Sequence, residues 1–334
     1  MKPEQPDPLW DPQLPAEGEL ARLQTLLGNY RHAPRPDFEW GVAPVPVPRR
    51  WHRFALAAAA VVVGVTVAGA AWLPWRLQWS ENRQWAIQSR AEAVPASLQV
   101  GRILATSSRE TATLKVARIG RMEVLPGTRV RLVDTRNGHH RVELLEGRMR
   151  ARIWAPPGYF GVSTGNGETV DLGCAFELHR NRHGKGDIQV SSGWVMHRVN
   201  GQETLVPEGY RLQFNEQRSG IPLAATSSAE LRVAVEQLDL ALAEGRRVPA
   251  LEQALAEQAA DGDRFTLLSL LTRYPALASG PLYPRLSAMF DEPRVDQRHR
   301  QAWQRGSVHA MNLWWERIPR PAKAWWLNWR DAFS

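Results

Sequence analysis

An uncharged apolar segment near the N-terminus, residues 54–73, limits most strongly what this chain can fold into. Its sequence is FALAAAAVVVGVTVAGAAWL. A helix of about twenty such residues is long enough to cross a hydrocarbon layer of roughly 30 Å. A cleaved signal peptide would begin nearer the N-terminus, and a buried core helix would not be apolar on every side. The segment therefore predicts one transmembrane helix.

Basic and aromatic side chains flank this segment as expected at the two surfaces of a membrane. The flanking residues are Arg49, Arg50, Trp51 and Arg53 before it, Trp72 at its end and Trp75 after it. Positive charge favours the cytoplasmic side of a span, and tryptophan concentrates at membrane interfaces. The pattern predicts a cytoplasmic tail over residues 1–53. Everything after a polar stalk at residues 74–97 is then expected on the other side.

The tail is predicted to contain one amphipathic helix, over about residues 17–31. Its apolar stripe consists of Leu20, Leu23, Leu27 and Tyr30, with Leu26 beside them. A helix on the membrane surface is the alternative, but Glu17 and Glu19 disfavour it because such helices carry a basic polar face. A single helix has no core of its own in which to bury the stripe. We therefore expect the stripe to bind a partner protein, ahead of a proline-rich linker.

Residues 98–214 have the pattern of an all-β domain. Short alternating runs are separated by turn sequences such as Pro126-Gly127, Asn137-Gly138 and Asn200-Gly201. Such spacing predicts a sandwich, a roll or a solenoid. Arginines recur at alternate positions within these runs, at Arg129, Arg131, Arg148, Arg150 and Arg152. We interpret them as the solvated face of a sheet.

From about residue 225 to residue 334 the period becomes helical, which predicts an α-helical C-terminal domain with a tryptophan-rich tail. Ser228 is a plausible N-cap of its first helix. Trp314 and Trp315 are expected to pack inside this domain. For the tryptophans at 325, 326 and 329, an amphipathic segment lying on the membrane and a simple exposed end remain alternatives.

One catalytic motif has to be weighed, because Gly161-Val162-Ser163-Thr164-Gly165 matches the G-x-S-x-G pattern of a hydrolase nucleophile elbow. That elbow requires a strand, a sharp turn and then a helix. Here an Asn166-Gly167 turn is followed by apolar residues at every second position from 170 to 178, which predicts a further strand. We therefore interpret the stretch as a β-hairpin and Ser163 as a sheet residue.

Other site chemistry is weakly indicated. His139 and His140 should point to opposite faces of a strand, and they, like His179 and His183, are interpreted as exposed turn residues. Asp171 and Glu177 would lie about 20 Å apart on one predicted strand, too far to act as a catalytic pair. Cys174 is predicted to be a small buried hydrophobe.

The formal net charge is +8, but the sequence contains no nucleic-acid motif. We expect no enzyme activity, no metal or other cofactor, and no direct contact with nucleic acid.

The β region resembles the FecR domain of transmembrane regulators. The resemblance rests on five ordered segments: ARIGRMEVLPGTRVRLV (117–133), VELLEGRMRARIW (142–154), FGVSTGNGETVDLGCAFEL (160–178), IQVSSGWVMHRV (188–199) and VPEGYRLQF (206–214). Well-known members of that family are anti-sigma factors. The resemblance implies a single-pass protein of the bacterial inner membrane whose periplasmic part relays an envelope signal to a cytoplasmic extracytoplasmic-function sigma factor.

Two functional hypotheses follow. In the first, the chain is an anti-sigma-factor-like signal transducer that holds its partner through the N-terminal helix. In the second, it is a membrane-anchored scaffold of the envelope whose β domain binds a cell-wall glycan or another protein, without any sigma factor. The expected fold is the same for both: one transmembrane helix, an all-β domain and a helical C-terminal domain.

Overall fold

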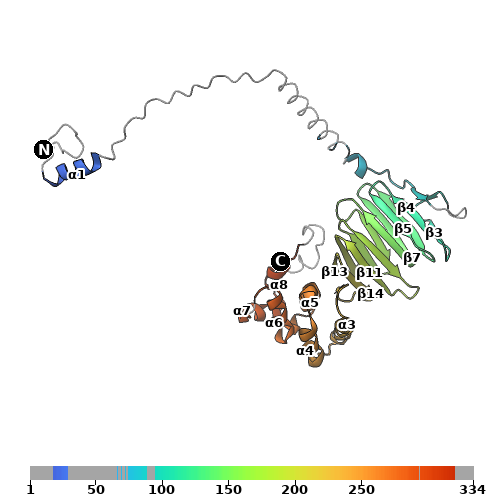
Figure 1. Ribbon diagram of the computed structural model, residues 1–334. Helices are drawn as coiled ribbons and strands as arrows, with labels where there is room; N and C mark the ends of the chain where they lie inside the picture. Colours follow the sequence, from blue (N-terminus) through green and yellow to red (C-terminus); the bar gives the residue numbers. More distant parts are fainter. Residues whose placement is uncertain are drawn as a thin grey trace, which may run out of the picture. The chain divides into compact units, whose positions relative to one another are not determined.

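The protein is described here by a computed structural model that covers residues 18–28, 66, 69, 72, 74–88, 95–292 and 294–319 (Figure 1). The chain divides into two compact units, Met1–Val65 and Thr66–Ser334. In the first unit, the described structure is the helix α1 (Glu19–Gly28). In the second unit, a large β domain is followed by helices.

The predicted membrane-spanning fold is corrected by the structure. Among the residues that the structure describes, none of the helices combines the length and the apolar character that crossing a bilayer requires. Most of segment 54–73 and the flanking residues 49–53 lie outside the described residues, and Thr66, Gly69 and Trp72 are helical. Hydropathy measures how apolar a segment is and does not by itself establish one continuous helix. The predicted localisation, which depended on the span, stays a prediction.

The β domain is built from antiparallel strands and one parallel pair. The strands are β1 (Trp85–Gln88), β2 (Ser97–Leu98), β3 (Ile103–Ala105), β4 (Ala112–Val116), β5 (Gly120–Val124), β6 (Arg129–Arg136), β7 (His139–Ile153), β8 (Phe160–Thr164), β9 (Gly167–Asp171), β10 (Ala175–Arg180), β11 (Gly186–Ser192), β12 (Trp194–Val199), β13 (Gln202–Pro207), β14 (Tyr210–Phe214) and β15 (Leu223–Ala224). The parallel pair is β7 with β8.

The strands form two layers, which we call the outer sheet and the inner sheet. The outer sheet has the order β1-β4-β5-β7-β10-β11-β14-β15, and the inner sheet has the order β3-β6-β7-β8-β9-β12-β13. Apolar side chains from both sheets, among them Val142, Met149 and Phe160, are fully buried in one common core. Of the three predicted β architectures, the structure is a sandwich.

The long strand β7 belongs to both sheets. Residues 139–146 pair with β6 in the inner sheet, and residues 147–152 pair with β10 in the outer sheet. Gly147, at the change of sheet, has φ +100°, a backbone conformation that side chains other than hydrogen rarely adopt. A Cβ atom at this position would also lie 2.5 Å from the Cα of Thr128. The bend of β7 therefore depends on glycine.

Gly147→Ala is expected to lower the free energy of unfolding by roughly 2 to 4 kcal/mol, because backbone strain and steric overlap add at this position. The matched control is Gly127→Ala. Gly127 also has a positive φ, +67°, but an added Cβ meets nothing within 4 Å. The control should therefore lose only about 1 kcal/mol of strain energy. Urea denaturation measures both values, and equal losses in the two variants would contradict the steric argument.

The single strand predicted over residues 170–178 is in fact two strands. β9 ends at Asp171 and β10 begins at Ala175, so the chain passes from the inner sheet to the outer sheet. The Asp171 carboxylate accepts hydrogen bonds from the Cys174 backbone nitrogen at 2.9 Å and from the Cys174 thiol at 2.6 Å. Leu172 and Cys174 are both buried, so apolar alternation continues through the turn and hides it. Cys174 is buried as predicted, and Asp171, which is buried beside it, lies on a different strand from Glu177.

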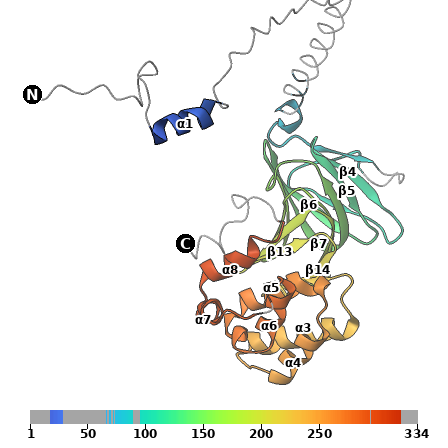
Figure 2. The ribbon, with the colours of Figure 1, turned by 60° about the vertical axis from the view of Figure 1, so that its left-hand side comes forward.

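The C-terminal helices pack against the free face of the inner sheet (Figure 2). They are α3 (Ala229–Ala243), α4 (Pro249–Gln258), α5 (Arg264–Arg273), α6 (Leu282–Met289), α7 (Gln297–Gln304) and α8 (Val308–Trp315), with short 3-10 turns η1 (Asp261–Asp263) and η2 (Pro275–Ser279). The Ser228 hydroxyl accepts from the Leu231 backbone nitrogen and caps α3 as predicted. Trp314 and Trp315 are buried, as predicted. The tryptophans at 325, 326 and 329 lie outside the described residues.

A buried ionic cluster joins the helices to the sheets. Asp239 of α3 pairs with Arg218 at 2.6 Å and with Arg273 of α5 at 3.5 Å, and it accepts a 2.8 Å hydrogen bond from the Tyr274 hydroxyl. Arg273 also donates to the Thr204 hydroxyl of β13 at 3.0 Å. Burial and the adjacent Asp239 charge raise the pKa of Tyr274 to about 12, so it stays a hydrogen-bond donor. The Asp239 cluster is therefore one polar link between the helices and the sandwich, in addition to their apolar packing.

Candidate functional site

The predicted partner-binding stripe is described only in part. In α1, Leu23 is 53% exposed and Leu26 is 61% exposed. The side chains of Leu20 and Leu27, and all of Tyr30, lie outside the described residues. The described part of α1 therefore presents two leucines to solvent.

The G-x-S-x-G stretch forms the predicted hairpin. Ser163 lies in β8, and after a turn at residues 165–166 the chain returns as β9, with Ser163 opposite Glu168. The element that follows Ser163 is a strand, so the geometry of a nucleophile elbow is absent from this hairpin.

The candidate metal ligands lie apart from one another. Among the described residues, no three His, Cys, Asp or Glu side chains are placed to hold a metal ion together. His139 and His140 point to opposite faces of β7 as predicted, but the prediction that His140 is exposed is wrong, because it is fully buried. His179 lies 3.3 Å from Asp187, on the next strand.

Two buried histidines share one arrangement. The Nδ1 atoms of His140 and His197 lie 2.8 Å and 2.9 Å from the hydroxyls of Thr135 and Thr169. Each Nε2 atom is buried without a hydrogen-bond partner in the described structure. Burial lowers the pKa of both imidazoles from 6.5 to about 4. Both rings are therefore neutral at neutral pH and belong to the core.

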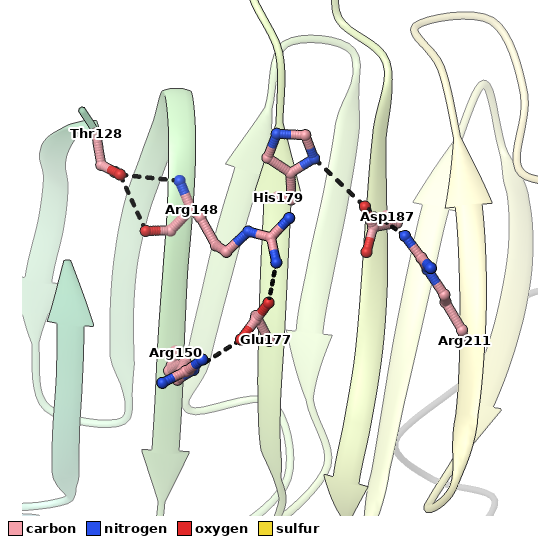
Figure 3. A network of polar contacts seen from close by, with 7 residues as sticks. All are labelled: Thr128, Arg148, Arg150, Glu177, His179, Asp187 and Arg211. Carbon is pink, nitrogen blue, oxygen red and sulfur yellow. Dashed lines mark hydrogen bonds and ion pairs between the residues drawn. The ribbon is translucent and has the colours of Figure 1, made fainter. Parts of the chain in front are cut away.

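The exposed face of the outer sheet carries a network of charged side chains (Figure 3). Adjacent strands present Arg148 and Arg150 on β7, and Glu177 on β10. The Glu177 carboxylate lies between the two guanidinium groups, at 2.6 Å from Arg148 and 2.7 Å from Arg150. The hydrogen bond to Glu177 raises the pKa of Arg150. This carboxylate therefore neutralises much of the charge at the middle of the face.

The next strands continue the same pattern of exposed pairs. Asp187 of β11 forms an ion pair with Arg211 of β14 at 3.1 Å and lies beside His179 of β10. On the other side, the Thr128 hydroxyl accepts from the Arg148 backbone nitrogen at 2.9 Å and donates to the Arg148 carbonyl at 3.0 Å (Figure 3). These two hydrogen bonds fix β7 where it enters the outer sheet. Exposed pairs of this kind contribute about 0 to 1 kcal/mol each to the free energy of folding. Their main effect is therefore to hold the side chains of this face in position.

Towards one edge of this face, three positive side chains lie side by side on neighbouring strands, next to Glu123 of β5. Lys115 of β4 lies directly opposite Arg121 of β5, and Arg121 lies directly opposite Arg152 of β7. We call these three residues the cationic row. All three are exposed, and within the described part of the chain no carboxylate forms an ion pair with any of them. Like charges on directly opposed residues destabilise a sheet, so the row is an unfavourable arrangement without an anion.

Two hollows adjoin the cationic row. The first, of about 370 Å³, is lined by residues that include Arg121, Arg152, Glu177 and Gln189. The second, of about 350 Å³, is lined by residues that include Arg152, Trp154 and Ser192. Arg152, Ala175 and Ser191 line both hollows, so these lie next to each other. Trp154 is 53% exposed, so its indole ring is accessible beside Arg152.

The sequence indicated only part of this surface. The alternation of Arg148, Arg150 and Arg152 predicted a solvated sheet face, and that is what the structure has. The sequence alternation did not indicate that Lys115 and Arg121 continue the series across two further strands. The missing information is the register of β4, β5 and β7, which places Arg121 opposite Arg152, a residue about thirty positions away in the sequence.

Comparison with known proteins gives little further guidance. No family model matches the chain, so the resemblance to the FecR family is not confirmed. No curated protein matches either. Among solved structures, two crystal structures of a "putative anti-sigma factor" from Parabacteroides distasonis, at 1.65 and 2.50 Å resolution, match with TM-scores of 0.33 and 0.32 and identities of 15% and 14%. Each match covers 40% of this chain and 63% of the other. TM-scores this low do not establish a shared fold.

Proposed function

We propose that this chain is a regulatory protein that acts by binding, and that α1 is the element that engages its partner. The observation that carries the proposal is the exposure of Leu23 and Leu26 on a short helix in its own compact unit. Burying a leucine side chain is worth about 1.5 to 3 kcal/mol. Two adjacent leucines therefore provide a substantial part of the energy of a helix-in-groove contact.

The class of partner comes from the sequence. The ordered motifs between residues 117 and 214 are similar to those of FecR-domain regulators, whose well-known members bind extracytoplasmic-function sigma factors. The partner we propose is a sigma factor of that class. Binding would sequester the sigma factor until the second unit of the chain responds to its own ligand.

Co-purification of the full-length chain with each extracytoplasmic-function sigma factor of its own organism tests this proposal. Leu23→Asp combined with Leu26→Asp should lower the affinity by about 100-fold or more, because each change places a charge in an apolar contact. Thr25→Asp is the matched control: Thr25 is exposed on the other side of α1 and should bind like the unchanged protein. Capture of no sigma factor, or equal capture by the double variant, would refute the proposed partner.

A further inference from the structure

We propose that the cationic row and the two hollows beside it form a binding site for an acidic oligosaccharide, one whose sugar rings carry carboxylates. This site lies on the strands of the outer sheet and does not involve α1. It therefore goes beyond the function proposed above, and either proposal can fail without the other.

The charge of the ligand follows from the balance of charges on this face. Arg148 and Arg150 already share the Glu177 carboxylate, and Arg211 already pairs with Asp187. The cationic row, in contrast, has three adjacent positive charges with no ion-paired carboxylate among the described residues. Planar guanidinium groups bind carboxylates through two parallel hydrogen bonds. A ligand with carboxylates at a regular spacing would relieve the repulsion along the row.

The sugar character of the ligand follows from the second hollow. The exposed indole of Trp154 gives a flat, rigid and weakly polar surface beside Arg152. Its backbone is held in place, since its carbonyl accepts from Arg76 at 2.7 Å and its nitrogen donates to Ile119 at 2.7 Å. The Ser191 hydroxyl donates to the Ala175 carbonyl at 3.0 Å, which leaves its oxygen as an acceptor. Aromatic, hydroxyl and guanidinium groups together match the apolar ring face, the hydroxyls and the carboxylate of an acidic sugar.

Two other polyanions have to be compared with an acidic sugar. Glu123 and Glu177 line the first hollow next to the row and would repel any anion there, so they do not separate a nucleic acid from a charged sugar; the thymidine competitor in the test below does. An extended acidic peptide is usually bound along the edge of a sheet, where its backbone can hydrogen-bond, whereas the row lies on the face of the sheet, across three strands that already pair with one another. Each hollow is at the small end of the range for ligand sites, and two adjoining hollows of similar volume suit a chain of repeating units.

The test is calorimetric titration of the full-length chain with a hexamer of galacturonic acid. The fully methyl-esterified hexamer has the same rings and no charge, so it isolates the carboxylates. Hexaglutamate and a single-stranded thymidine hexanucleotide serve as acidic competitors without sugar acids. All titrations are made at one salt concentration, because salt screens exposed charges.

We expect the acidic hexamer to bind at least about tenfold more tightly than its ester and than both competitors, since charge-assisted hydrogen bonds are worth about 1.5 to 3 kcal/mol each. Arg121→Gln combined with Arg152→Gln should weaken binding by about tenfold or more. Trp154→Ala should weaken it by about two- to tenfold. Arg211→Gln is the matched control, because Arg211 is exposed on the same face outside both hollows. It should change the affinity by less than about twofold.

Three results would overturn the proposal. The first is the absence of binding by the acidic hexamer. The second is an unchanged affinity in the Arg121 and Arg152 double variant. The third is equal or tighter binding of hexaglutamate or the oligonucleotide together with no effect of Trp154→Ala, which would mean a simple cationic surface. Circular dichroism and the melting temperature of each variant show whether it is folded, and all the substituted side chains are exposed.

Discussion

Replacing Asp239 with alanine is expected to lower the free energy of unfolding by about 3 to 5 kcal/mol. Asp239 is 3% exposed and is shared by Arg218, Arg273 and Tyr274. Removing the carboxylate leaves two guanidinium groups close together without their anion, and burial already lowers the pKa of Arg273. The cost is therefore that of an uncompensated buried charge and not only that of a lost ion pair.

This substitution should also separate the helices from the sandwich. The Asp239 cluster links α3 and α5 to the Thr204 hydroxyl on β13. Trp303, Trp314 and Trp315 are buried in the helical part and Trp85 in the sandwich, so three of these four tryptophans make near-ultraviolet circular dichroism sensitive to helix packing. In the Asp239 variant we expect this signal to be lost at a lower urea concentration than the far-ultraviolet signal. In the unchanged protein we expect the two transitions to coincide.

Glu244→Ala is the matched control for this prediction. Glu244 pairs with Arg246 at 2.6 Å at the end of the same helix, but the two side chains are 63% and 65% exposed. Exposed pairs contribute little, so the control should lose less than about 1 kcal/mol. If Asp239→Ala lost no more than the control, or if its two signals still changed together, the carboxylate would not be what couples the two parts.

Local sequence patterns were enough to predict much of this fold. The strands between β4 and β14 are separated by Asn-Gly, Glu-Gly and similar turns, which act over a few residues and can be recognised without tertiary contacts. Ser228 likewise marks the start of α3, because its cap involves a residue only three positions away. These elements depend on short-range chemistry, which is why the sequence indicates them.

Features that depend on distant contacts were not predictable in the same way. The burial of His140 follows from its position against Trp85 and Thr135, although its place after an Asn-Gly turn suggested exposure. The break at Asp171 is hidden because both sheets bury the residues of the turn. The cationic row exists only once β4, β5 and β7 are in register. In each case the deciding partner is far away in the sequence.

Acidification from pH 7 to pH 4 is expected to lower the free energy of unfolding by about 3 kcal/mol through three buried groups. His140 and His197 have folded-state pKa values of about 4, below the value of about 6.5 in an unfolded chain. As the pH falls through this window, the unfolded state takes up protons that the folded state does not. Each histidine therefore removes about 3 kcal/mol of stability between pH 6.5 and pH 4.

Asp171 acts in the opposite direction. Burial raises the pKa of its carboxyl to about 6, against an ordinary value of 3.8. Between pH 3.8 and pH 6 the folded state holds the proton more tightly than the unfolded state does, so acidification through this window stabilises the fold. The gain is about 3 kcal/mol and offsets one of the two histidines. The net loss arises from the other histidine.

Asp171→Asn should therefore double the loss of stability on acidification, from about 3 to about 6 kcal/mol, because it removes the offsetting group while an amide oxygen still accepts from the Cys174 backbone. Urea denaturation at pH 4, 5, 6 and 7 measures this loss. Asp291→Asn is the control: Asp291 is exposed and has φ +58°, a conformation that asparagine tolerates. Repulsion between the many positive charges at low pH is common to both variants and cancels in the comparison.

His140→Gln combined with His197→Gln should reverse the sign of the stability change on acidification, so that acidification stabilises the protein. A stability that falls equally in all variants would show that the three buried groups do not control its pH dependence.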